Sequence, residues 1–159
     1  MDAIESVLGQ YFFERIDYVI VDDGCAYDQT ILNCSSLSAV FDNVHYIRTL
    51  NRGLSAARNE GIEFCLKSLD RCDAIFLLDA DNRLRAGAIS RFFDVLQKDP
   101  EGDWFYPDIQ MFGIEYNGDY SGPFRKVTEV LMNICEAGSL VRRRVFDSGL
   151  RYDENMKLG

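Results

Sequence analysis

Residues 16–24 read IDYVIVDDG, and this stretch decides the fold. Its β-branched run predicts a strand over residues 16–21, and the Asp-Asp-Gly that follows is typical of a turn that ends a strand. A second run, DAIFLL at residues 73–78, is nearly all apolar and also ends in acid, at Asp79-Ala80-Asp81. Continuous apolar runs of this kind are typical of parallel strands covered on both faces. The two runs therefore predict a parallel sheet whose strands end in carboxylates.

The segments around these runs alternate between helical and extended patterns. Helices are expected over residues 2–12, 28–37, 54–69, 89–96 and 124–134, and further strands over residues 44–48 and 103–107. This alternation predicts an α/β layered sheet with right-handed crossovers. A length of 159 residues suits one domain, and no repeat or linker interrupts the chain. A single domain over residues 1–159 is therefore predicted.

The composition excludes several classes of protein. Asp and Glu number 26 against 17 Lys and Arg, so no nucleic-acid partner is expected, because binding a phosphate backbone needs a basic surface. No apolar run approaches the ~20 residues of a membrane-spanning helix. The first residues, MDAIE, lack the pattern of a secretion signal. Five cysteines without CxxC spacing indicate reduced thiols in a cytosolic protein, and the one histidine, His45, is interpreted as structural.

Two acidic turns are the candidate functional residues. Ligands of open α/β sheets bind beyond the carboxyl ends of the strands, so Asp22 and Asp23 are expected to converge with Asp79 and Asp81. Either turn alone is more often a turn or helix cap. Four carboxylates at one sheet edge, however, repel each other unless a cation or hydrogen-bond donors lie between them. Mg²⁺ or Mn²⁺ suits such a site, because one or two carboxylates hold the ion and substrate phosphates complete its coordination.

Several ordered segments resemble family 2 glycosyltransferases with the GT-A fold. They are AIESVLGQ (3–10), VIVDDG (19–24), NRGLSAARNEGI (51–62), LLDADN (77–82) and GSLVRR (138–143), followed by Phe146-Asp147 and Tyr152-Asp153-Glu154. The resemblance implies a Rossmann-like GT-A three-layer sheet with helices on both faces. It also implies a hexosyltransferase that moves a sugar from a nucleotide-diphosphate donor to an acceptor hydroxyl, with inversion and with Mg²⁺ or Mn²⁺. In a bacterium such an enzyme would build glycans or cell-envelope polysaccharides.

The resemblance also implies roles for single residues. The expected nucleotide-sugar contacts are Asp22, Asp23, Arg58, Asp79, Ala80 and Asp81. Asp22 and Asp23 would contact the base and ribose, and Arg58 would support the nucleotide. Asp81 would bind the metal and, through it, the diphosphate. The expected partners are a UDP- or GDP-sugar and a glycan or lipid-linked acceptor. The expected location is the cytoplasm, with peripheral association at the inner face of the membrane.

The sequence departs from the family pattern at both ends. Family members begin with an apolar strand before their first helix, whereas this sequence begins at that helix. Their general base, the Asp of a Gly-x-Glu-Asp signature, is expected beyond Gly159, and inverting transfer needs such a carboxylate. These departures predict a partial domain, shortened at both ends, whose sheet lacks its first strand near residues 19–21. One alternative is a catalytically inert fragment that binds a nucleotide-sugar. Another is a phospho-relay receiver domain, which also has an acid pair after a strand.

Two further clusters leave alternatives open. The aromatic residues Trp104-Phe105-Tyr106 with Phe112 and Tyr116 could stack on an acceptor sugar, but a core or interface role is favoured because large aromatics chiefly bury area. The run Arg142-Arg143-Arg144 could contact an anionic acceptor, a phosphate or a membrane surface. A solvated face is the favoured interpretation of these three charges.

Overall fold

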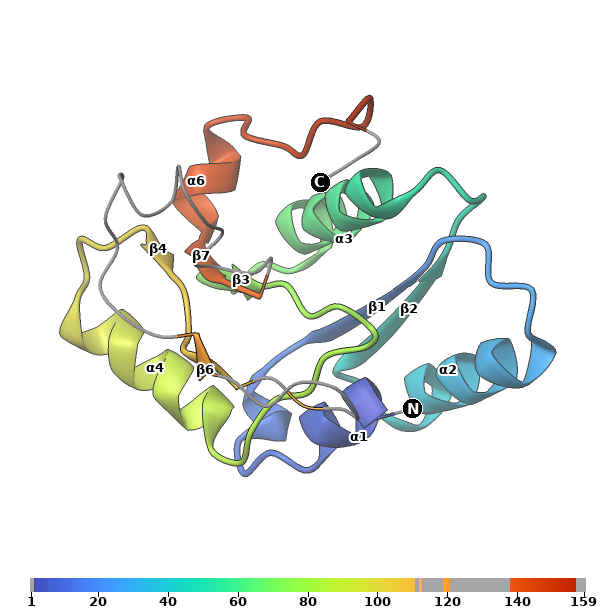
Figure 1. The fold of residues 1–159 in the computed structure, drawn as a ribbon, viewed down its shortest axis with the longest axis horizontal. Coiled ribbons are helices and arrows are strands. Elements are labelled where there is room, and N and C mark those ends of the chain that lie inside the picture. The colour runs from blue at the N-terminus through green and yellow to red at the C-terminus, as the bar shows by residue number, and fades with distance from the viewer. Residues whose placement is uncertain (1, 111, 113–118, 121–137, 157–159) are drawn as a thin grey trace. The chain divides into compact units, whose positions relative to one another are not determined.

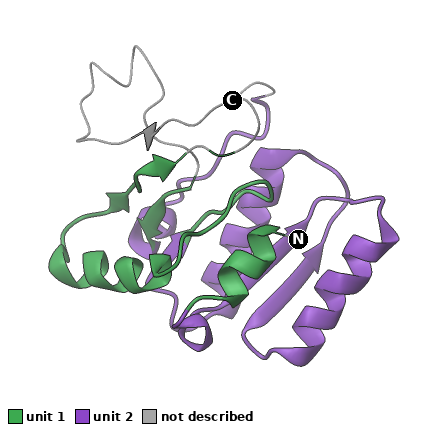
Figure 2. Cartoon of the chain, turned by 60° about the horizontal axis from the view of Figure 1, so that its bottom comes forward, with its two compact units in different colours: residues 1–10, 76–142 green, residues 11–75, 143–159 purple. Residues whose placement is uncertain are grey.

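The computed structural model describes residues 2–110, 112, 119–120 and 138–156. The chain divides into two compact units (Figure 2). Unit 1 comprises residues 1–10 and 76–142, and unit 2 comprises residues 11–75 and 143–159. The helix predicted over residues 124–134 lies outside the described residues.

Unit 2 is built on two parallel strands, β1 (Tyr18–Asp22) and β2 (Val44–Arg48), whose register pairs Asp22 with Arg48. The helix α2 (Asp28–Val40) connects these strands and packs on β2, while α3 (Leu54–Ser68) packs on β1. The two helices lie on opposite sides of the strand pair (Figure 1). Because both strands run in the same direction, their carboxyl ends lie at one edge. The parallel sheet predicted from residues 16–21 and 73–78 is not formed by those two runs, since residues 18–22 pair with residues 44–48 and residues 74–76 belong to a different sheet.

The other elements of unit 2 are short. A 3₁₀ turn, η1 (Phe13–Arg15), precedes β1, and α6 (Arg143–Asp147) packs on α3.

The helix predicted over residues 2–12 is shorter than expected. It corresponds to α1, which spans Asp2–Leu8 and belongs to unit 1. The Nε2 atom of His45 lies 2.8 Å from Asp17 Oδ1, and its interpretation as a structural residue stays a prediction.

Close packing of α3 against β1 explains its sequence. The helix buries four residues at a spacing of three, Ala56, Asn59, Ile62 and Cys65. A Cβ atom on Gly61 would lie 3.2 Å from a methyl group of Val21, so the glycine permits the helix to approach the strand. The helix predicted over residues 54–69 is therefore confirmed as α3, with Ala56 and Ile62 on its buried face.

Unit 1 joins helices to short antiparallel strands. Besides α1 it holds α4 (Ala88–Lys98) and the pair β4 (Trp104–Phe105) with β7 (Leu140–Arg142), in which Phe105 lies opposite Leu140. A second pair joins β5 (Ile109–Gln110) to β6 (Asp119–Tyr120). The strand β3 (Ala74–Phe76), whose last residue belongs to unit 1, completes the order β3-β7-β4.

The architecture confirms the predicted α/β fold class, with helices on both sides of a strand layer. The strands β1, β2, β3 and β4 and the helices α2, α3 and α4 all lie where the sequence predicted them, although β3 and β4 are shorter than expected. The sequence did not indicate β7 or α6. No helix within the described ranges is long and apolar enough to cross a membrane.

Candidate functional site

Asp22 is the last residue of β1, and its buried carboxylate accepts hydrogen bonds on both oxygens. The N–H of Cys25 donates to Oδ1 at 2.6 Å, and the hydroxyl of Tyr46 donates to Oδ2 at 2.6 Å. Arg48, opposite Asp22 in the parallel register, lies 3.6 Å from Oδ2. Burial by itself would raise the pKa of Asp22, but the hydrogen bonds from Tyr46 and Cys25 and the charge of Arg48 together lower it. These contacts show the turn-forming role, and a contact with substrate stays a prediction.

Tyr46→Phe is expected to lower the free energy of unfolding by about 1–2 kcal/mol, because one oxygen of a buried carboxylate loses its donor. The variant also changes the pH dependence. Since the folded-state pKa of Asp22 is lowered, its ionisation contributes stability above the ordinary pKa of aspartate, and this contribution is lost as the pH falls through the folded value. Without Tyr46 the loss of stability towards acid is expected to be smaller.

Urea unfolding from about pH 6 down to about pH 2, across and below the ordinary pKa of aspartate, measures this effect. Tyr27→Phe is the matched control, since Tyr27 is 75% exposed and should leave both the stability and its pH dependence unchanged. An acid decline in Tyr46→Phe as steep as in the wild type would contradict the assigned role of Tyr46.

Asp23 lies beside Asp22 but binds a different part of unit 2. Its Oδ1 accepts the N–H of Arg52 and its Oδ2 accepts the N–H of Gly53, both at 2.8 Å. These two residues directly precede α3, so the carboxylate lies at the positive end of the helix dipole. Asp23 therefore joins the turn after β1 to the loop before α3. Its expected contact with the base and ribose stays a prediction.

Gly24 completes this turn with a backbone conformation that only glycine adopts easily. Its φ is +78°, and a Cβ atom there would lie 2.8 Å from the backbone nitrogen of Asn51. The turn and the loop of residues 51–53 thus approach each other with no room for a side chain. The Asp-Asp-Gly triplet consequently requires glycine at its third position for two separate reasons.

Gly24→Ala is expected to destabilise the protein by about 2 kcal/mol, because the alanine is strained at positive φ and its Cβ overlaps Asn51. Gly53→Ala is the matched control: Gly53 has φ +94°, but no atom lies within 4 Å of the place its Cβ would take, so only the backbone strain of about 1 kcal/mol applies. Thermal unfolding compares the two variants. Equal losses would show that the approach to Asn51 does not constrain the turn.

The first half of α3 holds the segment of residues 151–154. Asn59, which is 9% exposed, donates from Nδ2 to the carbonyl of Tyr152 and to Glu154 Oε1, and its Oδ1 accepts the N–H of Tyr152. The guanidinium carbon of Arg58 lies 5.3 Å from the centre of the Tyr152 ring, a cation–π contact. Arg52 also faces Glu154, at 3.9 Å. Arg58, predicted to support the nucleotide, therefore contacts the segment that resembles the acceptor side.

The second acidic turn, Asp79-Ala80-Asp81, belongs to unit 1. The carbonyl of Asp79 accepts the N–H of Asn82 at 3.0 Å, which closes the turn. Asp79 is half-buried, whereas Ala80 and Asp81 are exposed. The carboxylate of Asp81 forms no hydrogen bond or ion pair with any other described residue. Because Asp22 and Asp23 belong to unit 2, the convergence of the two acidic turns stays a prediction.

Residues at the start of the chain hold the segment that follows Asp81. Ser6 Oγ accepts the N–H of Leu84 at 3.0 Å. Gln10, which is 7% exposed, donates to the carbonyls of Ser6 and Arg85 at 2.9 and 3.0 Å and accepts the N–H of Ile89 at 3.4 Å. The buried amide of Gln10 thus links the end of α1 to the start of α4.

The acidic turns can be compared with what a bound Mg²⁺ or Mn²⁺ ion requires when most of its ligands come from the substrate. Within the described part of the chain, no three His, Cys, Asp or Glu side chains form a group that could hold a metal ion by themselves. Mg²⁺ commonly needs only one or two carboxylates when phosphate oxygens and water complete its shell. The exposed carboxylate of Asp81 is of the chemical type that could supply one such ligand, and metal binding by this chain stays a prediction.

The interpretation of residues 142–144 as a solvated face is wrong for two of the three arginines. Arg142 and Arg143 do not form a solvated face, because their guanidinium groups donate to backbone carbonyls: those of Leu96, Asp99 and Gly102 for Arg142, and those of Leu66 and Leu69 for Arg143. Only Arg144 of the three is exposed. Trp104 and Phe112 are 45% and 52% exposed, so these two aromatic residues do not lie in the core, and an interface role for them stays a prediction. Tyr116 lies outside the described residues.

Sequence reasoning missed the residues that act through long-range hydrogen bonds. Tyr46 is 24 residues from Asp22 in the sequence, and Asn59 is 93 residues from Tyr152. The only available signal was a polar residue at a buried position of a predicted element, as for Asn59 on α3.

Comparison with known proteins identifies the family of the chain. The model of the family described as glycosyl transferase family 2 matches residues 2–150, which include both acidic turns. The minor teichoic acid biosynthesis protein GgaA of Bacillus subtilis (strain 168) is 28% identical over 172 aligned positions, which cover 98% of this chain and 36% of that protein. The chain thus spans about a third of the length of this curated relative. The family match decides against a receiver domain, and it shows that the chain belongs to glycosyl transferase family 2.

Proposed function

We propose that this chain binds a nucleotide-sugar and contributes to the transfer of its sugar, with inversion, to an acceptor hydroxyl. The observation that carries the proposal is the family match over residues 2–150. The geometry of unit 2 supports it, because Asp22 ends a parallel strand and Asp23 follows it, at the edge where α/β sheets bind ligands. The name of GgaA supports a role in cell-envelope synthesis. The acceptor in this proposal is a glycan or a lipid-linked molecule.

The two acidic turns would contact different parts of the nucleotide-sugar. Asp23 and Arg58 would orient the base and ribose, and Asp22 would hold the turn in shape through its bonds to Tyr46 and Cys25. Asp79 would lie near the ribose or sugar. Asp81 would hold Mg²⁺ or Mn²⁺, which when bound supplies positive charge that stabilises the departing diphosphate. The donor in this proposal is a UDP- or GDP-sugar.

Calorimetry with UDP and with GDP, each with Mn²⁺ and then with EDTA, tests this function. One nucleotide is expected to bind in the presence of Mn²⁺, and the affinity is expected to fall when the ion is removed. Failure of both nucleotides to bind with Mn²⁺ or Mg²⁺ would contradict the proposal. Release of free sugar from the matching donor then separates an active transferase from a protein that only binds nucleotide-sugar.

A further inference from the structure

The second acidic turn lies in a stretch of unit 1 without regular structure. Residues 77–87, between β3 and α4, form neither helix nor strand. The bond from the N–H of Asn82 to the carbonyl of Asp79 closes the turn, but the carboxylate of Asp81 makes no hydrogen bond or ion pair within the described ranges. The position of this carboxylate is therefore set by the contacts that hold the backbone next to it.

Three side chains at the start of the chain hold this backbone directly after the turn. Asp2 and Ser6 lie on α1 and Gln10 follows its end, and a spacing of four residues places them along one side of the helix. They contact three successive residues of the loop, which runs past α1 in Figure 1. The pairs are Asp2 with Arg83, Ser6 with Leu84, and Gln10 with Arg85.

Gln10 makes the most extensive of these contacts. Its side-chain amide is buried, with 7% of the residue exposed, and it uses both donors and its acceptor. Nε2 donates to the carbonyls of Ser6 and Arg85 at 2.9 and 3.0 Å, and Oε1 accepts the N–H of Ile89 at 3.4 Å. One side chain therefore fixes the loop after Asp81 both to α1 and to the first turn of α4.

We propose that Gln10 is a positioning residue for Asp81. The inference rests on the proposed function, because it assigns Gln10 a part in the Mn²⁺-dependent binding of nucleotide. A metal ligand has to be held to within about 0.5 Å of its productive place. Groups that orient such ligands typically contribute about 10–100-fold to metal affinity. In this role Gln10 acts through the backbone between Asp81 and Arg85 and contacts neither the metal nor the nucleotide.

Calorimetry of Gln10→Ala, with whichever of UDP and GDP binds the wild type, tests the inference. We expect the affinity in Mn²⁺ to fall about tenfold and the affinity in EDTA to stay unchanged, because only the metal ligand is displaced. In the Asp81→Ala background, Gln10→Ala should cause less than about a twofold further loss, since the group that it positions is absent. A merely structural role would lower binding equally in Mn²⁺, in EDTA and in the Asp81→Ala background.

Arg142→Ala is the matched control for a loss of stability at α4. Gln10 binds the N–H of Ile89 at the start of this helix, whereas Arg142 binds the carbonyls of Leu96 and Asp99 at its other end. Arg142→Ala should bind nucleotide and Mn²⁺ with the affinity of the wild type.

Ser6→Ala provides a second variant. It removes the acceptor of the Leu84 N–H, so its affinity for nucleotide in Mn²⁺ should also fall while its affinity in EDTA stays unchanged. This variant decides the matter if Gln10→Ala does not fold.

Two results would overturn the inference. One is an affinity in Mn²⁺ that is the same for Gln10→Ala as for Arg142→Ala. The other is a loss that is equally large in EDTA or in the Asp81→Ala background. Both results leave nucleotide binding by the wild type, and with it the proposed function, intact. Failure of the wild type to bind UDP or GDP would instead remove the proposed function and this inference together.

Discussion

Asp81→Ala is expected to weaken the Mn²⁺-dependent binding of UDP, or of GDP if that is the nucleotide bound, by at least about 100-fold. The exposed carboxylate of Asp81 is proposed to hold the cation that neutralises the diphosphate. Without it, two or more negative phosphate charges would approach an acidic turn with no bound metal to offset the repulsion. A 100-fold loss of affinity corresponds to about 2.7 kcal/mol. Calorimetry in Mn²⁺ measures it directly.

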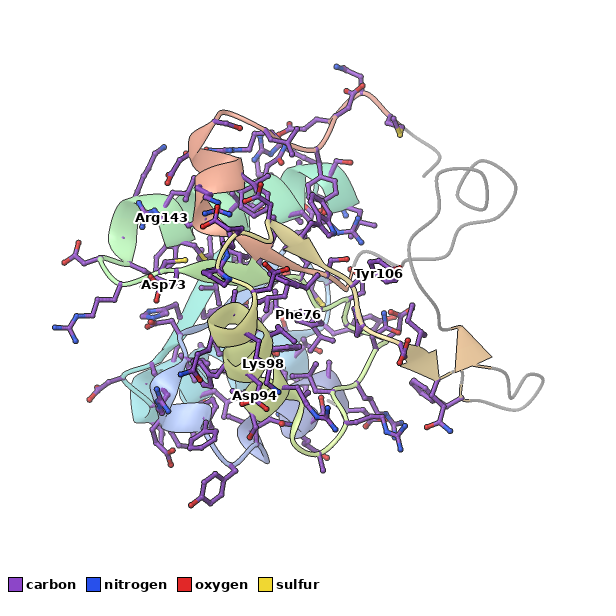
Figure 3. The ribbon with its side chains drawn as sticks, turned by 90° about the vertical axis from the view of Figure 1, so that its left-hand side faces the viewer. Asp73, Phe76, Asp94, Lys98, Tyr106 and Arg143 are labelled. Carbon is purple, nitrogen blue, oxygen red and sulfur yellow. The ribbon has the colours of Figure 1, made fainter. Side chains whose placement is uncertain are left out.

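Asp94→Ala is the matched control for this prediction. Asp94 is also an exposed aspartate of unit 1, on α4, and its removal changes the net charge by the same amount (Figure 3). Its affinity for nucleotide and Mn²⁺ should equal that of the wild type. If Asp81→Ala binds as tightly as Asp94→Ala, then Asp81 is not a metal ligand, whatever the rest of the family does.

Arg142→Ala is expected to lower the free energy of unfolding by about 3 kcal/mol. The guanidinium donates to the carbonyls of Leu96 and Asp99 at 2.8 Å, which closes the C-terminal end of α4, and to that of Gly102 at 2.7 Å. Hydrogen bonds from a charged donor contribute about 1.5–3 kcal/mol each, and partial exposure reduces the sum. For a chain of this length, the melting temperature should fall by about 6–12 °C.

Arg144→Ala provides the comparison, because Arg144 has the same charge two residues further along the chain but is exposed. Its melting temperature should change by less than about 2 °C. Arg142→Lys should recover only part of the stability, since one ammonium group does not reproduce the fork of the guanidinium. Equal melting temperatures for Arg142→Ala and Arg144→Ala would show that the bonds to the end of α4 contribute little.

The outline of the fold could be predicted because its signals are local. The β-branched run before Asp22 predicted β1, and the helical pattern over residues 54–69 predicted α3. The alternation of such segments predicted the α/β class. The position of Asp22 and Asp23 at the end of a strand follows from the same pattern, since a turn must begin where the apolar run ends.

Only the tertiary structure decided what each functional side chain contacts. The sequence around Asp23 does not indicate that its carboxylate accepts hydrogen bonds from the N–H groups of Arg52 and Gly53. The run of three arginines likewise does not indicate that Arg142 and Arg143 donate to backbone carbonyls. The physical reason is that these contacts join residues far apart in the sequence. Periodicity reports the face that a residue presents within its own element, whereas a hydrogen bond of about 2.8 Å depends on how elements tens of residues apart pack together.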